Sequence, residues 1–211
     1  MHKSILFDLD GTLTDSGEGI MKSTIFALNH YGIEAPPEAQ LRTVVGPPLT
    51  ESFARFGVPQ DKVEEAVEIY RSRYIPIGRF ENHPYPGVCT LLEKLRHDGH
   101  KIYVATSKPE WMAIEILEHF DLAIYFDIIC GAATDFSRNT KEAVITHLLS
   151  QCNEQVYAIM VGDTAYDVIG AKAHSIPCVG VSWGYGSIEE MENAGAVAIA
   201  NTMEHLYDLL K

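Results

Sequence analysis

Aspartates that follow short apolar runs are the first candidates for chemistry in this sequence. Asp8 and Asp10 lie in the segment DLDGT at residues 8–12, and Asp163 and Asp167 follow a later apolar run. If these carboxylates converge on one crevice, their charges repel one another unless a metal ion lies among them. Oxygen ligands in an open site favour Mg²⁺. The aspartates therefore predict a magnesium site.

Asp8 and Asp10 are two residues apart, so on a regular strand both would face the same side. Gly11 then allows the chain to turn sharply. Two such carboxylates can have different catalytic roles. One would be ionised and metal-bound as a nucleophile, and the other would be partly protonated as a general acid and base. The alternative is a strand end followed by an ordinary Asp-Gly turn.

The other candidates also have a plain structural interpretation. Thr106 and Ser107 could cap a helix ahead of Pro109, or they could place a hydroxyl and helix amides around a phosphate, and the two interpretations can coexist. Lys141 could be a solvated helix lysine. Asp163 could cap the next helix, although a carboxylate directly after a buried strand would be desolvated and close to the crevice.

The elements that must position these residues alternate between short apolar runs and helical patterns, which is typical of a parallel sheet. The predicted strands are residues 4–7, 101–106, 126–130, 156–161 and 177–181, with a short edge strand at 197–199. Right-handed crossovers would place helices on both faces. We therefore expect an α/β fold, a Rossmann-like doubly wound parallel sheet that binds ligands beyond the carboxyl ends of its strands.

Residues 16–82 break this alternation, because no convincing strand occurs among them. Apolar spacing predicts one helix through Met21, Ile25 and Leu28 and another over 63–74, with proline-rich and glycine-rich turns between helices. The interval is therefore predicted to be a small all-helical cap domain inserted after the first strand. Residues 1–15 and 83–211 would form the catalytic core.

Composition narrows the possible partners. With 46% hydrophobic and 21% charged residues among 211, the chain is an ordinary globular protein. Its net charge of −13 argues against nucleic-acid polymers and acidic membrane surfaces as partners. No apolar run approaches the roughly 20 residues that cross a bilayer, and no secretory signal is evident, so we expect a cytoplasmic protein. Four cysteines without a CxxC pair favour free, mostly buried thiols.

Four motifs, taken in chain order, resemble those of the haloacid dehalogenase superfamily. They are Asp8-x-Asp10-Gly11-Thr12, Thr106, Lys141 and Gly162-Asp163-x-x-x-Asp167. The match covers nearly the whole chain. The helical insertion, with VGPPL at 45–49, resembles the cap of the branch that contains phosphoglycolate phosphatases and 5′-nucleotidases.

The resemblance implies a role for each matched position. Asp8 would attack the phosphorus and become an aspartyl phosphate. Asp10 would protonate the leaving oxygen and then deprotonate the hydrolytic water. Thr106 and Lys141 would hold the phosphoryl oxygens, and Lys141 would also screen Asp8.

The resemblance also implies a ligand set for Mg²⁺. The Asp8 carboxylate, the Asp10 backbone carbonyl and Asp163 would bind the ion, with Asp167 supporting its water shell. This arrangement is sensible because phosphoryl transfer requires positioning and charge neutralisation more than elaborate covalent chemistry. Closure of the cap would exclude bulk water.

The expected substrate is a small phosphorylated metabolite, such as phosphoglycolate or a nucleoside 5′-monophosphate. We expect Gly11, Ser107, Lys108 and Arg42 to contribute to substrate binding, although Lys108 and Arg42 could equally be solvated surface cations. Neither the individual ester nor the oligomeric state follows from the sequence.

Three other functions stay open. A phosphosugar mutase or an inorganic pyrophosphatase of the same superfamily would share the core chemistry, whereas dehalogenation is disfavoured because the family's dehalogenases lack a carboxylate at the position of Asp10. A receiver-like signalling module would also phosphorylate a strand-end aspartate. The Asp10-Gly11-Thr12 sequence and the long helical insertion argue against the receiver.

Overall fold

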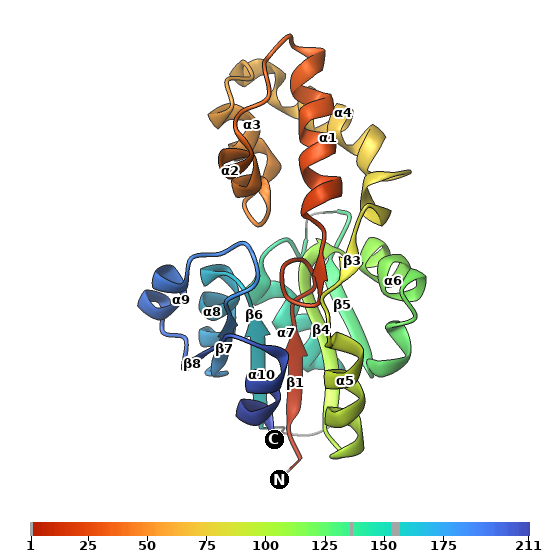
Figure 1. The fold of residues 1–211 in the computed structure, drawn as a ribbon, viewed down its shortest axis with the longest axis vertical. Helices are drawn as coiled ribbons and strands as arrows, with labels where there is room; N and C mark the ends of the chain where they lie inside the picture. Colours follow the sequence, from red (N-terminus) through yellow and green to blue (C-terminus); the bar gives the residue numbers. More distant parts are fainter. Residues whose placement is uncertain (1, 136, 153–156) are drawn as a thin grey trace. The chain divides into compact units, whose positions relative to one another are not determined.

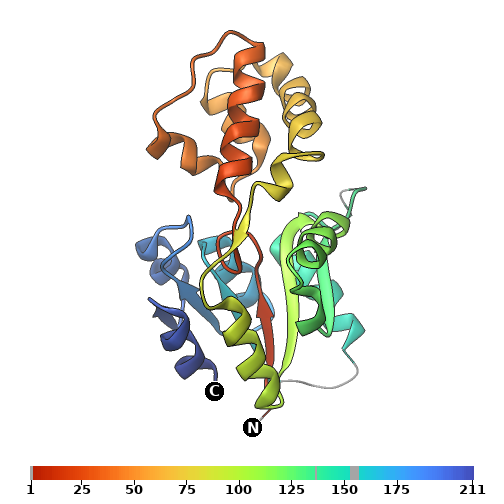
Figure 2. The same cartoon turned by 45° about the vertical axis from the view of Figure 1, so that its right-hand side comes forward.

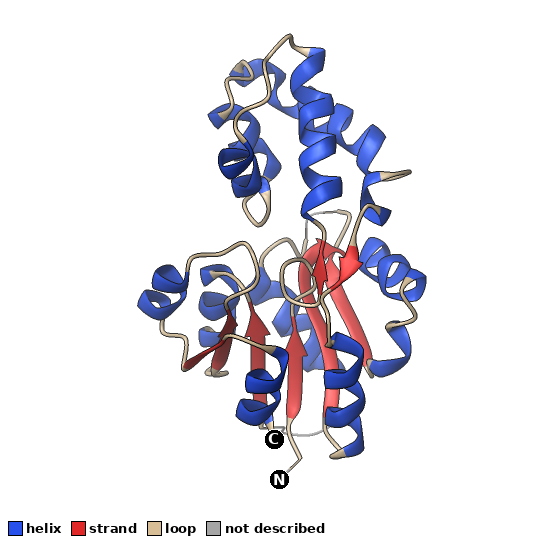
Figure 3. Cartoon of the chain, viewed as in Figure 1, coloured by secondary structure: helices blue, strands red, loops and turns tan. Residues whose placement is uncertain are grey.

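The computed structural model describes residues 2–135, 137–152 and 157–211. The chain forms two compact units, one made of Met1–Thr14 and Pro84–Lys211 and the other of Asp15–His83. Figure 3 shows that the first unit combines a sheet with helices, whereas the second is built from helices.

A six-stranded parallel sheet forms the centre of the larger unit, as far as the structure describes it. Its strands, in spatial order, are β5 (Ile128–Ala132), β4 (Lys101–Pro109), β1 (Ser4–Phe7), β6 (Ala158–Gly162), β7 (Cys178–Val181) and β8 (Ala198–Ala200). The chain adds β4 and β5 on one side of β1 and the remaining strands on the other. The winding therefore reverses at β1, and ligands of such sheets bind beyond the carboxyl ends of the strands at this point.

Helices cover both faces of the sheet (Figures 1 and 2). Those on one face are α5 (Val88–His97) and α10 (Met203–Leu210), and those on the other are α7 (Lys141–Gln151), α8 (Ala165–Lys172) and α9 (Ile188–Ala194). α6 (Glu110–His119) packs on β4 and β5 and is followed by the 3₁₀ turn η4 (Ala123–Tyr125). Every residue of β1, β6 and β7 is buried, as a parallel sheet with two covered faces requires. The predicted doubly wound α/β fold is confirmed.

One strand is longer than predicted, and this changes the interpretation of the residues that follow it. β4 runs to Pro109 instead of ending at residue 106, and its pairing with β5 resumes between Pro109 and Ala132 after a register shift. Pro109 is the N-cap of α6, so the alternative in which Thr106 and Ser107 cap this helix is wrong. The backbone stays extended here because sheet pairing overrides the local capping preference. The start of the predicted strand 156–161, Val156, lies outside the described residues.

The second unit contains helices only between residues 16 and 82, all of which the structure describes. These are α1 (Gly17–His30), α2 (Glu38–Leu41), α3 (Leu49–Arg55) and α4 (Val63–Tyr74), with 3₁₀ turns η1 (Arg42–Val44), η2 (Gln60–Lys62) and η3 (Gly78–Phe80). α1 packs on α4, and Arg73 pairs with Glu81 at 2.8 Å while it donates to Ser23 Oγ. A helical insert after β1 is therefore confirmed.

Two short strands lie where the chain passes between the units. β2 (Thr14–Asp15) pairs with β3 (His83–Pro84), and each contains only two residues. Among the described residues, no helix combines the length and the apolar character needed to cross a membrane.

Candidate active site

The loop after β1 holds its two aspartates in place through backbone hydrogen bonds. The Asp8 amide donates to the Val161 carbonyl on the neighbouring strand at 2.9 Å. Asp10 forms an isolated bridge with Thr14, and the Gly11 amide donates to the Thr14 carbonyl at 2.8 Å. Gly11 has a φ of +82°, a left-handed conformation that glycine adopts without strain. The loop therefore turns back on itself directly after the second carboxylate.

Lys141, the first residue of α7, places its ammonium among three oxygens. Its Nζ lies 2.8 Å from Asp8 Oδ1, 2.7 Å from Asp167 Oδ1 and 3.0 Å from the Ala105 carbonyl oxygen, to which it donates. Lys141 thus forms ion pairs with two buried carboxylates at once. The lysine therefore fixes Asp8 from one side and neutralises part of the buried negative charge.

Asp163 follows β6 and is almost completely enclosed. Thr12 Oγ1 donates to its Oδ1 at 3.3 Å, and the Tyr185 amide donates to its Oδ2 at 2.8 Å. A Cβ added at Gly11 would lie 2.2 Å from Asp163 Oδ2, and one added at Gly184 would lie 2.3 Å from Asp163 Cβ. Two glycines are thus needed so that the backbone can approach this carboxylate from two loops.

Asp167 has a structural partner for each of its oxygens. Its Oδ2 accepts hydrogen bonds from the backbone amide and the hydroxyl of Thr164, which completes a capping box at the start of α8. Its Oδ1 faces Lys141, and the residue has no exposed surface. The alternative that Asp163 caps the next helix is therefore wrong, because Asp167 completes the capping box and Asp163 accepts from the loop after β7.

The donor set fits a hard divalent cation. Carboxylate oxygens of Asp8, Asp163 and Asp167 lie within 4.8 Å of one another, and all three residues are buried. Burial raises the pKa of Asp163 to about 8, with a further increase from Asp167 and Asp8. Burial likewise raises the pKa of Asp8 to about 6, although Lys141 opposes this shift. Ionising these buried carboxylates costs free energy. A bound Mg²⁺ would stabilise their ionised form.

The formal charges support the same conclusion. Four aspartates contribute −4, and the two lysines that contact them, Lys108 and Lys141, contribute +2. One divalent cation would therefore bring the formal charge of this largely buried cluster to zero, and unpaired charge is strongly disfavoured when buried.

Lys108 binds the second aspartate of the β1 loop. Its Nζ lies 2.7 Å from Asp10 Oδ2 and 3.0 Å from Asp10 Oδ1, and its side chain is 5% exposed. The Lys108 amide donates to Thr106 Oγ1 at 3.2 Å. Lys108 is thus a buried partner of Asp10, so the alternative of a solvated surface cation is wrong for this residue.

The remaining predicted residues have different surroundings. Thr106 is buried at the edge of this cluster, whereas Ser107 is exposed. Arg42 is an exposed residue at the start of η1 and belongs to the helical unit. The larger unit therefore brings together Asp8, Asp10, Thr106, Lys108, Lys141, Asp163 and Asp167 by contacts that the structure shows.

The loop after β7 also contributes to the site, and position alone indicates Trp183 and Tyr185 as residues near it, without their contacts. The Trp183 indole donates to the Thr12 carbonyl at 3.1 Å, and the next residues supply the Gly184 contact and the Tyr185 amide described above. This segment holds both the β1 loop and Asp163. The signal available in the sequence was its position after a parallel strand, with glycines on both sides of an aromatic residue.

A family model and a solved structure identify the relationships of this chain. The model of the haloacid dehalogenase-like hydrolases matches residues 5–181. The crystal structure of a predicted phosphatase from Clostridium acetobutylicum superposes with a TM-score of 0.92 at 43% identity, covering 100% of this chain and 98% of the other.

Curated relatives agree on the family and differ in their named activities. A 5′-nucleotidase from Pseudomonas aeruginosa is 43% identical over 90% of this chain and 87% of its own. The tyrosine-protein kinase PtkA of Mycobacterium tuberculosis is 41% identical over 98% of this chain and 72% of its own. A phosphoglycolate phosphatase from Rhodospirillum rubrum is 32% identical over 100% and 91%. The resemblance in the four motifs is thereby confirmed, and the chain belongs to the haloacid dehalogenase-like hydrolases as a phosphatase.

Proposed function

We propose that the chain hydrolyses small phosphate monoesters with Mg²⁺ and forms a phospho-aspartate on Asp8. The observation that carries this proposal is the position of the Asp8 carboxylate at the carboxyl end of β1. Its Oδ1 is buried and lies 2.8 Å from Lys141 Nζ, yet 12% of the side chain is exposed. One carboxylate oxygen is therefore anchored while the rest of the group remains open to a substrate.

Asp8 would act as the nucleophile. The ion pair with Lys141 favours the ionised carboxylate, and the buried contact restricts its rotation. Attack on phosphorus forms a new O–P bond to Asp8 and breaks the P–O bond to the leaving alcohol. Water then attacks the phospho-aspartate, which releases inorganic phosphate and regenerates the carboxylate.

Asp10 would act as the general acid and base. In the first step it donates a proton to the leaving alkoxide, and in the second it takes a proton from the attacking water. Lys108 contacts both of its oxygens, so it holds the carboxylate in one orientation beside Asp8. The side chain of Asp10 is 20% exposed, which leaves it open to the leaving group.

Mg²⁺ would be held by the carboxylates of Asp8 and Asp163 and by the Asp10 carbonyl. Asp167 would support the water shell of the ion and would not bind the ion directly, because Thr164 and Lys141 already contact its two oxygens. When bound, the ion supplies charge neutralisation for the phosphoryl oxygens.

Thr106 would hold a phosphoryl oxygen through its hydroxyl proton. Its Oγ1 accepts a hydrogen bond from the Lys108 amide, so the O–H of the same hydroxyl can donate to a phosphoryl oxygen. Lys141 already has three oxygen neighbours, so its main role is to orient Asp8. Gly11, Ser107 and Arg42 stay predicted substrate contacts.

A nucleoside 5′-monophosphate is the substrate class that we propose first. The support is the 43% identity with a relative named 5′-nucleotidase, compared with 32% for the relative named phosphoglycolate phosphatase. Phosphoglycolate is the second candidate. The relative named as a tyrosine kinase suggests a second acceptor besides water, because a tyrosine hydroxyl in place of water would convert the same phospho-aspartate chemistry into phosphotransfer.

The test is phosphate release from a panel of nucleotides, phosphoglycolate, sugar phosphates and pyrophosphate, with Mg²⁺ or with EDTA. Wild type should release phosphate only with the metal, and Asp8→Asn should lower the rate on the order of a thousandfold or more. Asp208→Asn, which changes an exposed aspartate 55% open to solvent, is the matched control and should retain full activity.

Other outcomes would overturn parts of the proposal. Isomerised sugar phosphate without free phosphate would indicate a mutase, and release confined to pyrophosphate would indicate a pyrophosphatase. Transfer of phosphate from ATP to a tyrosine peptide, without release from monoesters, would identify a kinase. A stable phosphate on Asp8 without turnover would indicate a signalling module.

A further inference from the structure

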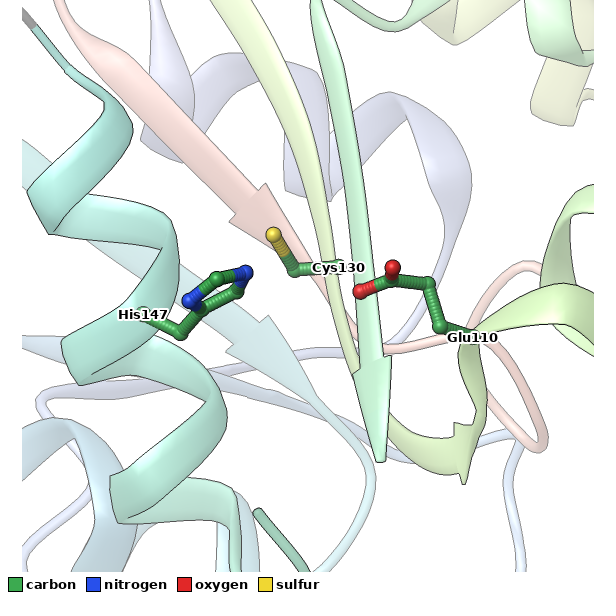
Figure 4. Close-up of side chains that lie close together, drawn as sticks. All are labelled: Glu110, Cys130 and His147. Atoms are coloured by element: carbon green, nitrogen blue, oxygen red, sulfur yellow. The ribbon is translucent and has the colours of Figure 1, made fainter. Parts of the chain in front are cut away.

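A second cluster of metal-ligating side chains lies outside the aspartate site. Glu110 is the first residue of α6, Cys130 lies in β5 and His147 lies in α7. Figure 4 shows the three side chains converging from these elements. One ligand atom of each, a carboxylate oxygen, the sulfur and a ring nitrogen, lies within 4.8 Å of the other two.

The side chains retain acceptor capacity that the protein does not use. The His147 ring has no hydrogen-bond partner within the described part of the chain. Cys130 is 1% exposed, and its sulfur accepts one weak hydrogen bond from Gln151 Nε2 at 3.3 Å. In the part of the chain that the structure describes, Glu110 uses only Oε2, which accepts from the Gly131 amide at 3.1 Å and from Arg138 at 2.7 Å. Oε1 is therefore available to a ligand.

We propose that Glu110, Cys130 and His147 form a binding site for a thiophilic divalent cation, with Zn²⁺ as the natural candidate. Thiolate, imidazole and carboxylate are the ligand types that Zn²⁺ takes in proteins, and three protein ligands leave one position for water. Zinc bonds of about 2.0–2.3 Å in a tetrahedron would bring the ligand atoms to roughly 3.6 Å apart. The separations in the structure are at most 4.8 Å, so small side-chain rotations would bring the ligand atoms to this arrangement.

The chemistry separates this site from the aspartate cluster. Mg²⁺ prefers oxygen ligands, whereas a thiolate with imidazole selects Zn²⁺. Lys141 and His147 lie on the same helix, six residues and about 9 Å apart along its axis.

Binding would replace the S–H bond of Cys130 by an S–Zn bond and release one proton to solvent. An ion here would tie α7 to β5 and α6.

A structural role explains only part of the cluster. Arg138 Nε donates to the Gly131 carbonyl at 2.7 Å, so Arg138 and Glu110 together satisfy the backbone of the edge strand β5. This explains the position of Glu110. This structural role gives no reason for the side chain of His147 to be directed at the buried thiol of Cys130. His147 and Cys130 therefore carry the proposal.

Cobalt spectroscopy tests the site on the full chain. The protein is stripped of metal, saturated with Mg²⁺ and titrated anaerobically with Co²⁺. We expect one equivalent of Co²⁺ to produce the near-ultraviolet charge-transfer band of a cobalt–thiolate bond, and one equivalent of Zn²⁺ to remove it. Absence of this band, with only weak visible bands from oxygen ligands, would overturn the proposal.

Variants assign the ligands. Cys130→Ser should abolish the band, and His147→Ala should weaken Co²⁺ affinity by more than the roughly 10- to 100-fold that loss of an outer-shell partner costs. Cys89→Ser, at an exposed cysteine, and His97→Ala, at an exposed histidine, are the matched controls and should retain the band. Because His147 is only half-buried, its variant tests the site even if Cys130→Ser fails to fold. A Co²⁺ affinity in His147→Ala equal to that of wild type would contradict the assignment.

Discussion

The ammonium of Lys108 lies within 3.0 Å of both oxygens of the Asp10 carboxylate. The two residues come from different strand ends, the loop after β1 and the end of β4. Lys108 is therefore placed to orient the Asp10 carboxylate, the proposed acid–base group, rather than to extend into solvent.

Replacing Lys108 by methionine should lower kcat more than it raises KM, by roughly 10- to 100-fold, because a misplaced acid–base group slows the chemical step. Steady-state kinetics on the best monoester of the panel provide the measurement. Lys101→Met is the control, since Lys101 is 62% exposed and pairs with Asp127 away from the cluster. Equal kinetics for Lys108→Met and wild type would show that Asp10 needs no orienting partner.

Replacing Lys141 by methionine should abolish turnover and lower the free energy of unfolding by about 3–5 kcal/mol, because buried Asp8 and Asp167 lose their cation. Chemical denaturation measures the second effect. Adding Asp167→Asn to this variant should restore part of the stability, since one uncompensated charge is removed. A double variant no more stable than the single one would contradict this account of the buried pair.

Without metal, the protein should be less stable at alkaline pH than at mildly acidic pH. The pKa of Asp163 rises from 3.8 in the unfolded chain to about 8 in the folded one, mainly through burial. The folded state therefore binds more protons between these values, and stability falls as pH rises through them. Thermal unfolding in EDTA should show a midpoint lower at about pH 9 than at about pH 5.

The Asp163→Asn variant serves as the control for this pH effect and should flatten the dependence. Because the cation needs ionised carboxylates, the increase in midpoint caused by Mg²⁺ should grow over the same range. A midpoint in EDTA that rises steadily from pH 5 to pH 9 would contradict the proposed burial cost.

Replacing Gly11 by alanine should remove activity, whereas Gly57→Ala should not. Both glycines have positive φ, +82° and +93°, so both variants cost about 1–2 kcal/mol of backbone strain. Only at Gly11 does the new Cβ meet Asp163, at 2.2 Å from Oδ2, while nothing lies within 4 Å of the Cβ at Gly57. Similar activity losses for the two variants, measured at equal folded fraction, would refute a specific role of Gly11 beside Asp163.

The sequence predicts the sheet well because its strands are buried on both faces and are therefore nearly continuous apolar runs. The position of Asp8 at a strand end follows directly from that pattern. β4 is different, because polar Ser107 and Lys108 continue the strand where local preference indicates a cap. Long-range pairing with β5 decides this boundary, and no local pattern encodes it.

The contacts between distant loops could not be predicted from the sequence. The hydrogen bond from Trp183 to the Thr12 carbonyl spans 171 residues, and the contact between Lys108 and Asp10 spans 98. Such contacts depend on the order of strands in the sheet, which places β4 beside β1 and β7 one strand further away, beside β6. Residue type and spacing indicate the chemistry, whereas topology determines which residues share the site.

Trapping the phosphorylated enzyme tests the central claim most directly. Asp10→Asn should slow hydrolysis of the intermediate, because an amide cannot accept a proton from the attacking water. Rapid acid quench of this variant with Mg²⁺ and the best monoester, followed by peptide mass spectrometry, should find one phosphoryl group on Asp8. Phosphate on another residue, or turnover in wild type without a phosphorylated species in either protein, would contradict the account.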